Sequence, residues 1–169
     1  MEAQVSTEKT NLFGMSVREL EKFVLELGLE KFRAKQIYKW LYTKNTRNFD
    51  EITDLSKKAR DILKEKACLG GLTLITREIS NDGTEKYLFA TSEGQKVESV
   101  LMFFEDRDTH TACISSQVGC AVGCPFCATG TLGFLKNLSA AQIAEQIQFM
   151  QSISGKRVDS VVYMGQGEP

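Results

Sequence analysis

The sequence lacks any long hydrophobic run and is poor in proline, histidine and tryptophan, with two, one and one among its 169 residues. No apolar stretch approaches the roughly 20 residues that a membrane-spanning helix needs. The first ten residues, MEAQVSTEKT, contain no apolar segment of the kind that a signal peptide has. A hydrophobic content of 42% and a charged content of 25% exclude a collagen-like chain, a disordered tail and a disulfide-stapled mini-protein. We therefore expect a globular protein of the cytoplasm, too short for a complete large barrel enzyme.

Charge is distributed unevenly, although the net charge is only −1. Residues 1–67 hold 14 Lys and Arg against 11 Asp and Glu, whereas residues 68–169 hold 7 against 11. A mildly basic first half could approach a polyanion, because phosphate contacts supply most of the sequence-independent affinity for nucleic acids. On charge alone, a solvated helical surface is the better interpretation.

Residues 1–70 are predicted to form a small helical domain. Ser16 and Glu19 have the spacing of a capping box at the start of the first helix. A second amphipathic helix is expected to begin near Phe32 or Arg33, and a third to span about 55–67. The pair Gly70-Gly71 ends this section.

From residue 71 the hydrophobic period changes to that of strands. Residues 71–104 predict a small antiparallel sheet, with Asp82-Gly83 and Glu93-Gly94 as its hairpin turns. Residues 105–111 form a charged connection, and 111–117 predict a short strand. A helix capped by Ser139 and a strand over 160–165 follow. The fold class is therefore α/β, and residues 105–169 would begin a βα barrel or doubly wound sheet. A lone βαβ unit leaves an open edge, so we expect a part of a longer protein.

Four of the five cysteines fall within 15 residues, and three of them form the pattern Cys120-x-x-x-Cys124-x-x-Cys127. Three thiolates are one short of a closed structural metal site, and a [4Fe–4S] cluster held in this way keeps one iron open. The spacing favours iron and sulfur over zinc with Cys113 as a fourth ligand, and a redox thiol set is a weaker alternative. The only histidine, His110, is interpreted as a surface residue.

A second motif, Gly165-x-Gly167-Glu168-Pro169, follows the last predicted strand. Its glycines would let the backbone approach a ligand, and Glu168 would offer a carboxylate to an ammonium group. Alone this pattern is weak evidence for a ligand site. With three cysteines about 40 residues upstream, it is the layout of a radical S-adenosylmethionine enzyme.

The sequence resembles the radical S-adenosylmethionine methyltransferases that modify adenosine in ribosomal RNA. The resemblance is carried by CISSQVGCAVGCPFCATGTLGFLKNLSAAQIAEQ (113–146), FRAKQIYKWLY (32–42), DGTEKYLFA (82–90), VESVLM (97–102) and VVYMGQGEP (161–169). The most similar branch is the dual-specificity one, which methylates carbon 2 of an adenine in 23S ribosomal RNA and in tRNA. The fold it implies is an N-terminal helical domain and a β-hairpin region, followed by the first part of a radical S-adenosylmethionine barrel.

The resemblance also implies roles for single residues. Cys120, Cys124 and Cys127 would hold a [4Fe–4S] cluster, and the pair Gly167-Glu168 would contact S-adenosylmethionine. Glu98 would accept a proton from a covalent protein–RNA adduct. Cys113 would release the product through a transient disulfide with a methyl-carrying cysteine near the family's C-terminus.

From its residue type alone, Glu98 would be an ordinary exposed strand glutamate and Cys113 a buried strand cysteine. The sequence contains no counterpart of the methyl-carrying cysteine, and Cys68 matches no family cysteine. We therefore expect the 169 residues alone not to turn over.

Partners implied by the resemblance are 23S ribosomal RNA, tRNA and an electron donor such as flavodoxin, with a monomeric protein and no membrane. Arg33, Lys35 and Lys39 are candidate RNA-contacting residues, whereas Trp40 is expected to pack in the core. Two alternatives stay open: a sister enzyme that methylates carbon 8 of the adenine, and a zinc-stabilised RNA-binding module.

Overall fold

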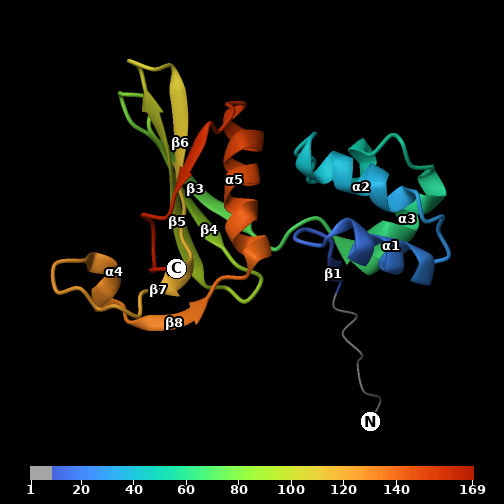
Figure 1. The fold of residues 1–169 in the computed structure, drawn as a ribbon, viewed down its shortest axis with the longest axis horizontal. Coiled ribbons are helices and arrows are strands. Elements are labelled where there is room, and N and C mark those ends of the chain that lie inside the picture. The colour runs from blue at the N-terminus through green and yellow to red at the C-terminus, as the bar shows by residue number, and fades with distance from the viewer. Residues whose placement is uncertain (1–8) are drawn as a thin grey trace, which may run out of the picture. The chain divides into compact units, whose positions relative to one another are not determined.

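The computed structural model describes residues 9–169, which form two compact units (Figure 1). The first unit ends at Gly71 and the second spans Leu72–Pro169. Within the described residues, no helix has the length and apolar character needed to cross a membrane. Each unit has its own buried side chains, so each is described separately.

The first unit is a three-helix arrangement closed by two very short strands. Its elements in chain order are β1 (Thr10–Asn11), α1 (Val17–Glu26), α2 (Arg33–Tyr42), the short 3₁₀ helix η1 (Phe49–Glu51), α3 (Lys57–Lys66) and β2 (Ala67–Cys68). The strands β1 and β2 pair in parallel and bring the two ends of the unit together. Fully buried side chains from each helix, including Leu20, Ile37 and Leu63, form its core.

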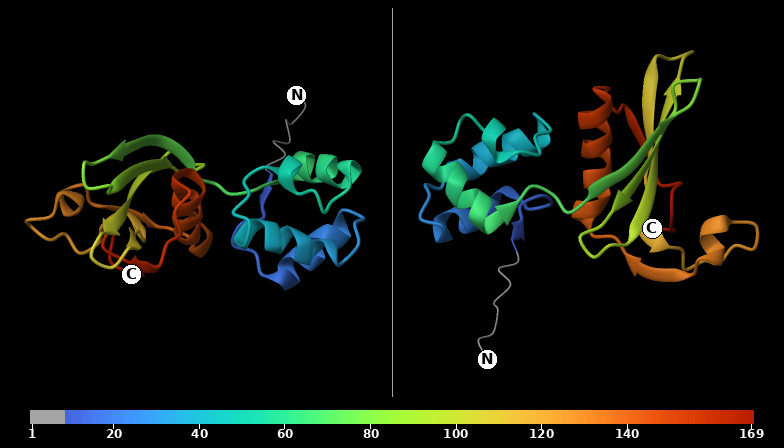
Figure 2. Two further views of the ribbon diagram at one scale, coloured as in Figure 1. Left: turned by 90° about the horizontal axis from the view of Figure 1, so that it is seen from above. Right: turned by 180° about the vertical axis from the view of Figure 1, so that it is seen from behind.

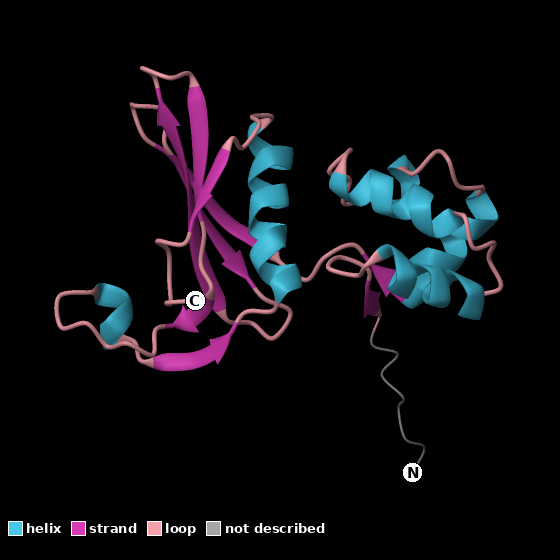
Figure 3. Cartoon of the chain, viewed as in Figure 1, coloured by secondary structure: helices cyan, strands magenta, loops and turns pink. Residues whose placement is uncertain are grey.

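The second unit contains a five-stranded mixed sheet and one long helix. Its strands are β3 (Thr73–Ile79), β4 (Glu85–Ala90), β5 (Lys96–Phe104), β6 (Thr109–Cys113) and β9 (Ser160–Val162), in the order β3-β4-β5-β6-β9. The first four strands are antiparallel neighbours, and β9 pairs in parallel with β6. A separate pair, β7 (Gln117–Gly119) and β8 (Phe134–Asn137), flanks the short helix α4 (Ala128–Thr131), as Figure 3 shows.

Helix α5 (Ala140–Ser154) lies along one face of this sheet, as the two views of Figure 2 agree. The core between them contains Tyr87 and Phe89 from β4, Val97 and Leu101 from β5, and Met150 from α5. Because successive side chains of a strand point to opposite faces, the alternate residues, such as Leu88 of β4 and Glu98 and Val100 of β5, face away from α5. The sheet therefore has one packed face and one open face.

Most of the predicted elements are confirmed. Capping boxes begin α1 at Ser16 and α5 at Ser139, and α2 begins at Arg33. The two predicted turns connect antiparallel strands, with Gly83 and Gly94 both at positive φ.

The region 105–119 differs from the prediction. The strand predicted over 111–117 is β6, which begins at Thr109 and ends at Cys113. His110 lies within this strand and stacks on Phe103 with ring centroids 4.9 Å apart, so placing it in a charged loop was wrong. Strand β8 was not predicted, and β9 ends at Val162 rather than at 165.

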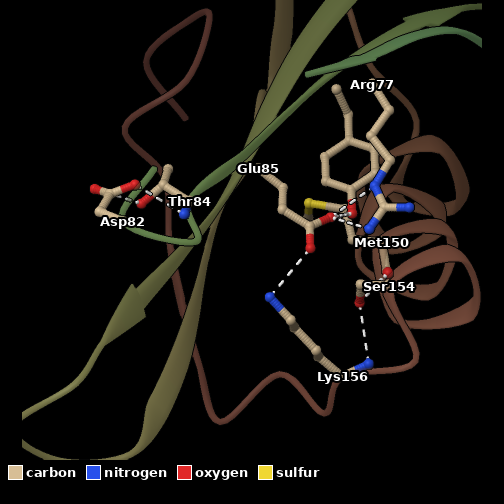
Figure 4. A network of polar contacts seen from close by, with 8 residues as sticks. Arg77, Asp82, Thr84, Glu85, Met150, Ser154 and Lys156 are labelled. Atoms are coloured by element: carbon tan, nitrogen blue, oxygen red, sulfur yellow. Dashed lines mark hydrogen bonds and ion pairs between the residues drawn. The ribbon is translucent and has the colours of Figure 1, made fainter. Parts of the chain in front are cut away.

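The buried carboxylate of Glu85, the first residue of β4, forms a network of hydrogen bonds and ion pairs. Glu85 on β4 is 1% exposed and accepts hydrogen bonds from Arg77 (2.8 Å) and from the hydroxyl of Tyr87. Lys156, which follows α5, lies 3.1 Å from its other oxygen (Figure 4). Burial alone would raise the pKa of Glu85, but these hydrogen bonds and charges outweigh it and leave the pKa below its ordinary value of 4.5. The network links β3, β4 and the segment that leads into β9.

We expect Glu85→Gln to lower the free energy of unfolding by about 1–3 kcal/mol, because a neutral amide leaves its buried partners poorly satisfied. In the parent, the carboxylate's contribution is complete above pH 4.5 and is lost as the pH falls through the lower pKa of the folded state. The variant should lack this acid-dependent loss. Urea unfolding followed by circular dichroism at several pH values measures both effects.

The matched control is Glu78→Gln, which neutralises an exposed carboxylate on the neighbouring strand. An equal loss of stability in the two variants would contradict the role given to Glu85.

Candidate functional site

The carboxyl ends of β6 and β9 meet at one edge of the sheet. The two strands are parallel, with Thr111 opposite Ser160 and Cys113 opposite Val162. Whatever follows each strand must therefore lie at the same edge, which is where α/β sheets place their ligands. The chain after β6 runs into the cysteine loop, here residues 120–127, and the chain after β9 runs into the motif Gly165–Pro169.

Backbone hydrogen bonds join these two segments directly. The amide of Gly165 donates to the carbonyl of Ile114 at 3.1 Å, and the amides of Ser116 and Gln117 donate to the carbonyl of Gln166 at 2.9 and 3.1 Å. Figure 1 accordingly shows the C-terminus beside β7. The pairing of β6 with β9 thus continues past the ends of both strands.

This close approach explains both glycines of the motif. A Cβ on Gly165 would lie 2.7 Å from the carbonyl of Ile114, and a Cβ on Gly167 would lie 2.5 Å from the side chain of Gln117. Gly167 also has φ +95°, a conformation that side chains rarely adopt. The sequence suggested that these glycines admit a ligand, whereas the structure brings them against the chain itself.

One side chain connects the cysteine loop to the Gly-Glu-Pro motif. The buried Gln117 accepts hydrogen bonds at its Oε1 from the amides of Ala121 and Glu168, both at 3.4 Å. Its Nε2 donates to Asn137 of β8 at 2.9 Å. Ala121 directly follows Cys120, so this amide group sets the position of the first cysteine relative to Glu168.

The cysteine loop itself has no helix or strand between Cys120 and Cys127 (Figure 3). Its ends are anchored by backbone hydrogen bonds, from Cys120 to Gly133 at 3.0 Å and from Cys127 to Cys124 at 3.1 Å. The three thiols are partly accessible, and none of the five cysteines, all within residues 9–169, forms a disulfide. Hydrogen bonds from the amides of Gly130 and Thr129 lower the pKa of Cys127, which favours the thiolate that metals bind.

Glu98 and Cys113 both lie on the open face of the sheet. Cys113 on β6 is opposite Val100 of β5, and Glu98 is two residues before Val100, so the two side chains occupy diagonal positions on that face. Glu98 forms an ion pair with Lys86 of β4 at 2.8 Å. The hydrogen bond and the negative charge of Glu98 raise the pKa of Lys86.

The thiol of Cys113 is partly buried where β6 ends. Burial raises its pKa, and a hydrogen bond from the amide of Met164 partly opposes that shift. This amide directly precedes Gly165, so the sulfur of Cys113 touches the segment that carries the Gly-Glu-Pro motif.

The residues present fit a thiolate-bound cluster and a small polar ligand in their chemistry. In residues 9–169, no three Cys, His, Asp or Glu side chains are already gathered as metal ligands, with or without Cys113. The donor set in the loop nevertheless consists of accessible soft thiols, which suit iron–sulfur ligation. At the neighbouring edge, Ser116 and Gln166 each have a buried oxygen without a hydrogen-bond partner among the described residues. Ser116 also lines a cavity of about 350 Å³ together with Glu168. Unpaired buried oxygens are what a bound polar ligand or water would satisfy.

The chain is similar to several known proteins. Residues 10–69 match the family model described as the ribosomal RNA large subunit methyltransferase N-terminal domain. The chain is 48% identical over 160 residues to a probable dual-specificity RNA methyltransferase RlmN from Thermotoga neapolitana, covering 94% of this chain and 46% of that protein. It is 49% identical over 156 residues to the dual-specificity RNA methyltransferase RlmN of Geobacter sulfurreducens, covering 92% of this chain and 42% of that protein.

A solved structure is similar as well. The crystal structure of a radical SAM methyltransferase from Sphaerobacter thermophilus superimposes with a TM-score of 0.86 at 38% identity, over 95% of this chain and 48% of that one. Over nearly all of its length the chain is therefore similar to part of the RlmN-type radical SAM methyltransferases. It spans about half the length of the curated relatives that it matches.

Within this family fold, the structure brings most of the predicted site residues to one region. The loop of Cys120, Cys124 and Cys127 and the pair Gly167-Glu168 meet at one edge, with Glu98 and Cys113 on the adjoining open face. Sequence reasoning did not find Gln117, Lys86 or the amide of Met164. Gln117 and Lys86 lie within strands, and no spacing rule marks which strand positions will face a site. The Met164 contact depends on a backbone group, which carries no sequence signal.

We predict that Gly119→Ala destabilises the second unit more than Gly123→Ala does. Both glycines have positive φ, at +74° and +66°, so each substitution should lower the free energy of unfolding by a similar amount of about 1–2 kcal/mol. Only at Gly119 would the new Cβ meet a backbone atom, the carbonyl oxygen of Gly133 at 1.8 Å. That clash should cost about 1–3 kcal/mol more and break the hydrogen bond from Cys120.

Urea unfolding of the two variants measures the difference in stability, and hydrogen exchange at the Cys120 amide reports the broken bond. Equal losses for the two variants, with the Cys120 amide still protected, would show that this close approach does not exist in solution.

Proposed function

We propose that this chain supplies the cluster-binding loop and part of the S-adenosylmethionine site of a radical SAM methyltransferase acting on carbon 2 of an adenine in 23S ribosomal RNA and tRNA. The observation that carries the proposal is the contact of Gln117 with both Ala121 and Glu168. Through it, a three-cysteine loop and a Gly-Glu-Pro motif lie side by side at the carboxyl ends of parallel strands. The names of the relatives supply the substrate class.

Each site residue then has a defined task. Cys120, Cys124 and Cys127 would hold a [4Fe–4S] cluster through three thiolates, which leaves one iron open for the methionine part of S-adenosylmethionine. Glu168 and the backbone at Gly167 would bind the ammonium group of that cofactor. The bound pair supplies one-electron chemistry that protein side chains lack.

The two residues on the open face would handle the substrate. Glu98 would accept at its carboxylate the proton that leaves carbon 2 of the adenine, and the ion pair with Lys86 would hold that carboxylate in place. Cys113 would release the methylated product by forming a transient disulfide with the methyl-carrying cysteine that the resemblance implies. The bond between that cysteine's sulfur and the transferred carbon would break, and its electron pair would leave with the product. The sulfur of Cys113 is accessible enough for this step, yet is held by the amide of Met164.

The first unit would contact RNA. Lys35 and Lys39 of α2 are exposed, whereas Arg33 of the same helix is half-buried and donates hydrogen bonds within the first unit, including one to the carbonyl of Asp54 at 3.1 Å. Trp40 is half-buried and donates its indole N–H to Asp54 at 2.8 Å, so it is not the core residue that the sequence suggested. Lysine side chains that face solvent offer phosphate contacts without base specificity.

We place the whole protein in the cytoplasm as a monomer, with a flavodoxin-type electron donor.

Anaerobic reconstitution with iron and sulfide tests the proposal. We expect a brown protein whose reduced EPR spectrum shifts when S-adenosylmethionine is added, because the open iron gains a ligand. Cys124→Ala should abolish formation of the cluster, whereas Cys68→Ala, which removes a thiol of the first unit, should leave it intact.

A colourless protein that retains zinc would contradict the radical chemistry and favour the zinc-stabilised module. A cluster whose spectrum ignores S-adenosylmethionine would contradict the roles of Gly167 and Glu168. Mass spectrometry of nucleosides from RNA treated with a relative of full length distinguishes carbon 2 from carbon 8 as the methylated position.

A further inference from the structure

The hydroxyl of Ser115 joins two segments that the proposed function uses separately. Ser115 is 0% exposed and lies two residues after Cys113. Its Oγ donates to the carbonyl oxygen of Glu98 at 2.6 Å and accepts a hydrogen bond from the amide of Gln166 at 2.9 Å. One buried oxygen atom therefore connects the strand that carries Glu98 to the middle of the Gly-Glu-Pro segment.

The backbone of Ser115 is itself fixed by a buried side chain of α5. Gln146, also 0% exposed, accepts a hydrogen bond from the Ser115 amide at 2.8 Å and donates one to its carbonyl oxygen at 2.9 Å. The carboxamide thus pairs with both backbone groups of Ser115, as a neighbouring strand would. Its Oε1 also accepts a hydrogen bond from Ser99 of β5 at 2.7 Å.

This arrangement leaves Ser115 little freedom. The backbone is held by Gln146, and the hydroxyl is held at both its donor and its acceptor side. Gly165 belongs to the same arrangement, because a Cβ there would lie 2.7 Å from Ser115 Oγ. An ordinary buried serine needs one partner to be satisfied. Here the hydroxyl bridges two different segments, and a glycine makes room for it.

We propose that Ser115, fixed by Gln146, is a positioning residue that keeps residues 165–168 in register with the strand bearing Glu98. The inference rests on the proposed function for what this segment binds. If the hydroxyl sets the register, it also sets how far a ligand at Glu168 lies from the carboxylate of Glu98 and the thiol of Cys113. Ser115 touches none of the reacting groups and acts only through the backbone of Glu98 and Gln166.

The test compares Ser115→Ala with Ser99→Ala in the 169-residue chain. Both variants remove a buried hydroxyl from a residue that Gln146 contacts, but only the Ser115 hydroxyl contacts the Gln166 amide. We expect hydrogen exchange at the Gln166 amide to be at least tenfold faster in Ser115→Ala than in the parent. The same amide in Ser99→Ala should stay within threefold of the parent. Ser115→Thr, which restores the hydroxyl, should also stay within threefold.

Alkylation of Cys113 by iodoacetamide gives a second readout. A displaced 164–168 segment withdraws the Met164 amide from the sulfur, so we expect the rate to change at least threefold in Ser115→Ala and not in Ser99→Ala. Exchange in Ser115→Ala that matches the parent, or equal acceleration in both alanine variants, overturns the proposal. A Ser115→Ala protein that does not fold also overturns it, because the hydroxyl would then serve global stability.

The exchange experiment needs no cofactor, which separates the two proposals. A tenfold effect at Gln166 in a protein that binds no S-adenosylmethionine after reconstitution would support positioning by Ser115 and contradict the proposed function. Normal binding of S-adenosylmethionine with no effect at Gln166 would support the proposed function and contradict positioning by Ser115.

Discussion

The contact between residues 114–117 and 165–167 is made by backbone against backbone, and the rest of the site depends on it. Its hydrogen bonds extend the β6–β9 pair beyond the ends of both strands. They require the two backbone segments to approach more closely than a Cβ at Gly165 or Gly167 would permit. Gly165 and Gly167 meet that requirement, the latter in a backbone conformation suited to glycine. Because of this contact, two motifs more than 35 residues apart in sequence become neighbours at one edge of the sheet.

Buried polar side chains specify this geometry, whereas the apolar core supplies most of the driving force. Three of these side chains are Glu85 of β4, on the face packed against α5, and Glu145 and Gln146 of α5. Each has a hydrogen-bond partner outside its own helix or strand: Arg77, Leu72 and Ser115, respectively. A buried polar group is costly unless its partners are in place, so alternative registers of the strands are penalised. The open face carries the reactive candidates Glu98 and Cys113, where access matters more than packing.

Much of the fold could be predicted because its signals are local. Capping boxes mark α1 and α5, and alternating apolar residues with Asp-Gly and Glu-Gly turns mark β3, β4 and β5. Strand β8 escaped prediction because four residues paired only with β7 have no period of their own. His110 was misplaced for a similar reason, since its strand is defined by pairing with β5 and β9. The spacing of the cysteines indicated the chemistry of the loop. The roles proposed for Glu98 and Cys113 rest on the family resemblance, because neither an ion pair with Lys86 nor a shared sheet face can be read from the sequence.

The ends of the cysteine loop are fixed, whereas its three thiols are not gathered at one point among the described residues. This combination has a physical reason. Three thiolates held close together without a cation repel one another, so the energy for gathering them must come from the metal. The Gly119 turn against Gly133 and the Gln117 contact with Ala121 set where the loop starts, independently of any ligand. The proposed cluster would then need to order only the residues between Cys120 and Cys127, which would lower the conformational entropy lost. A fixed frame explains why a Cβ on Gly119 would meet backbone, while Gly123 inside the loop has open space around it.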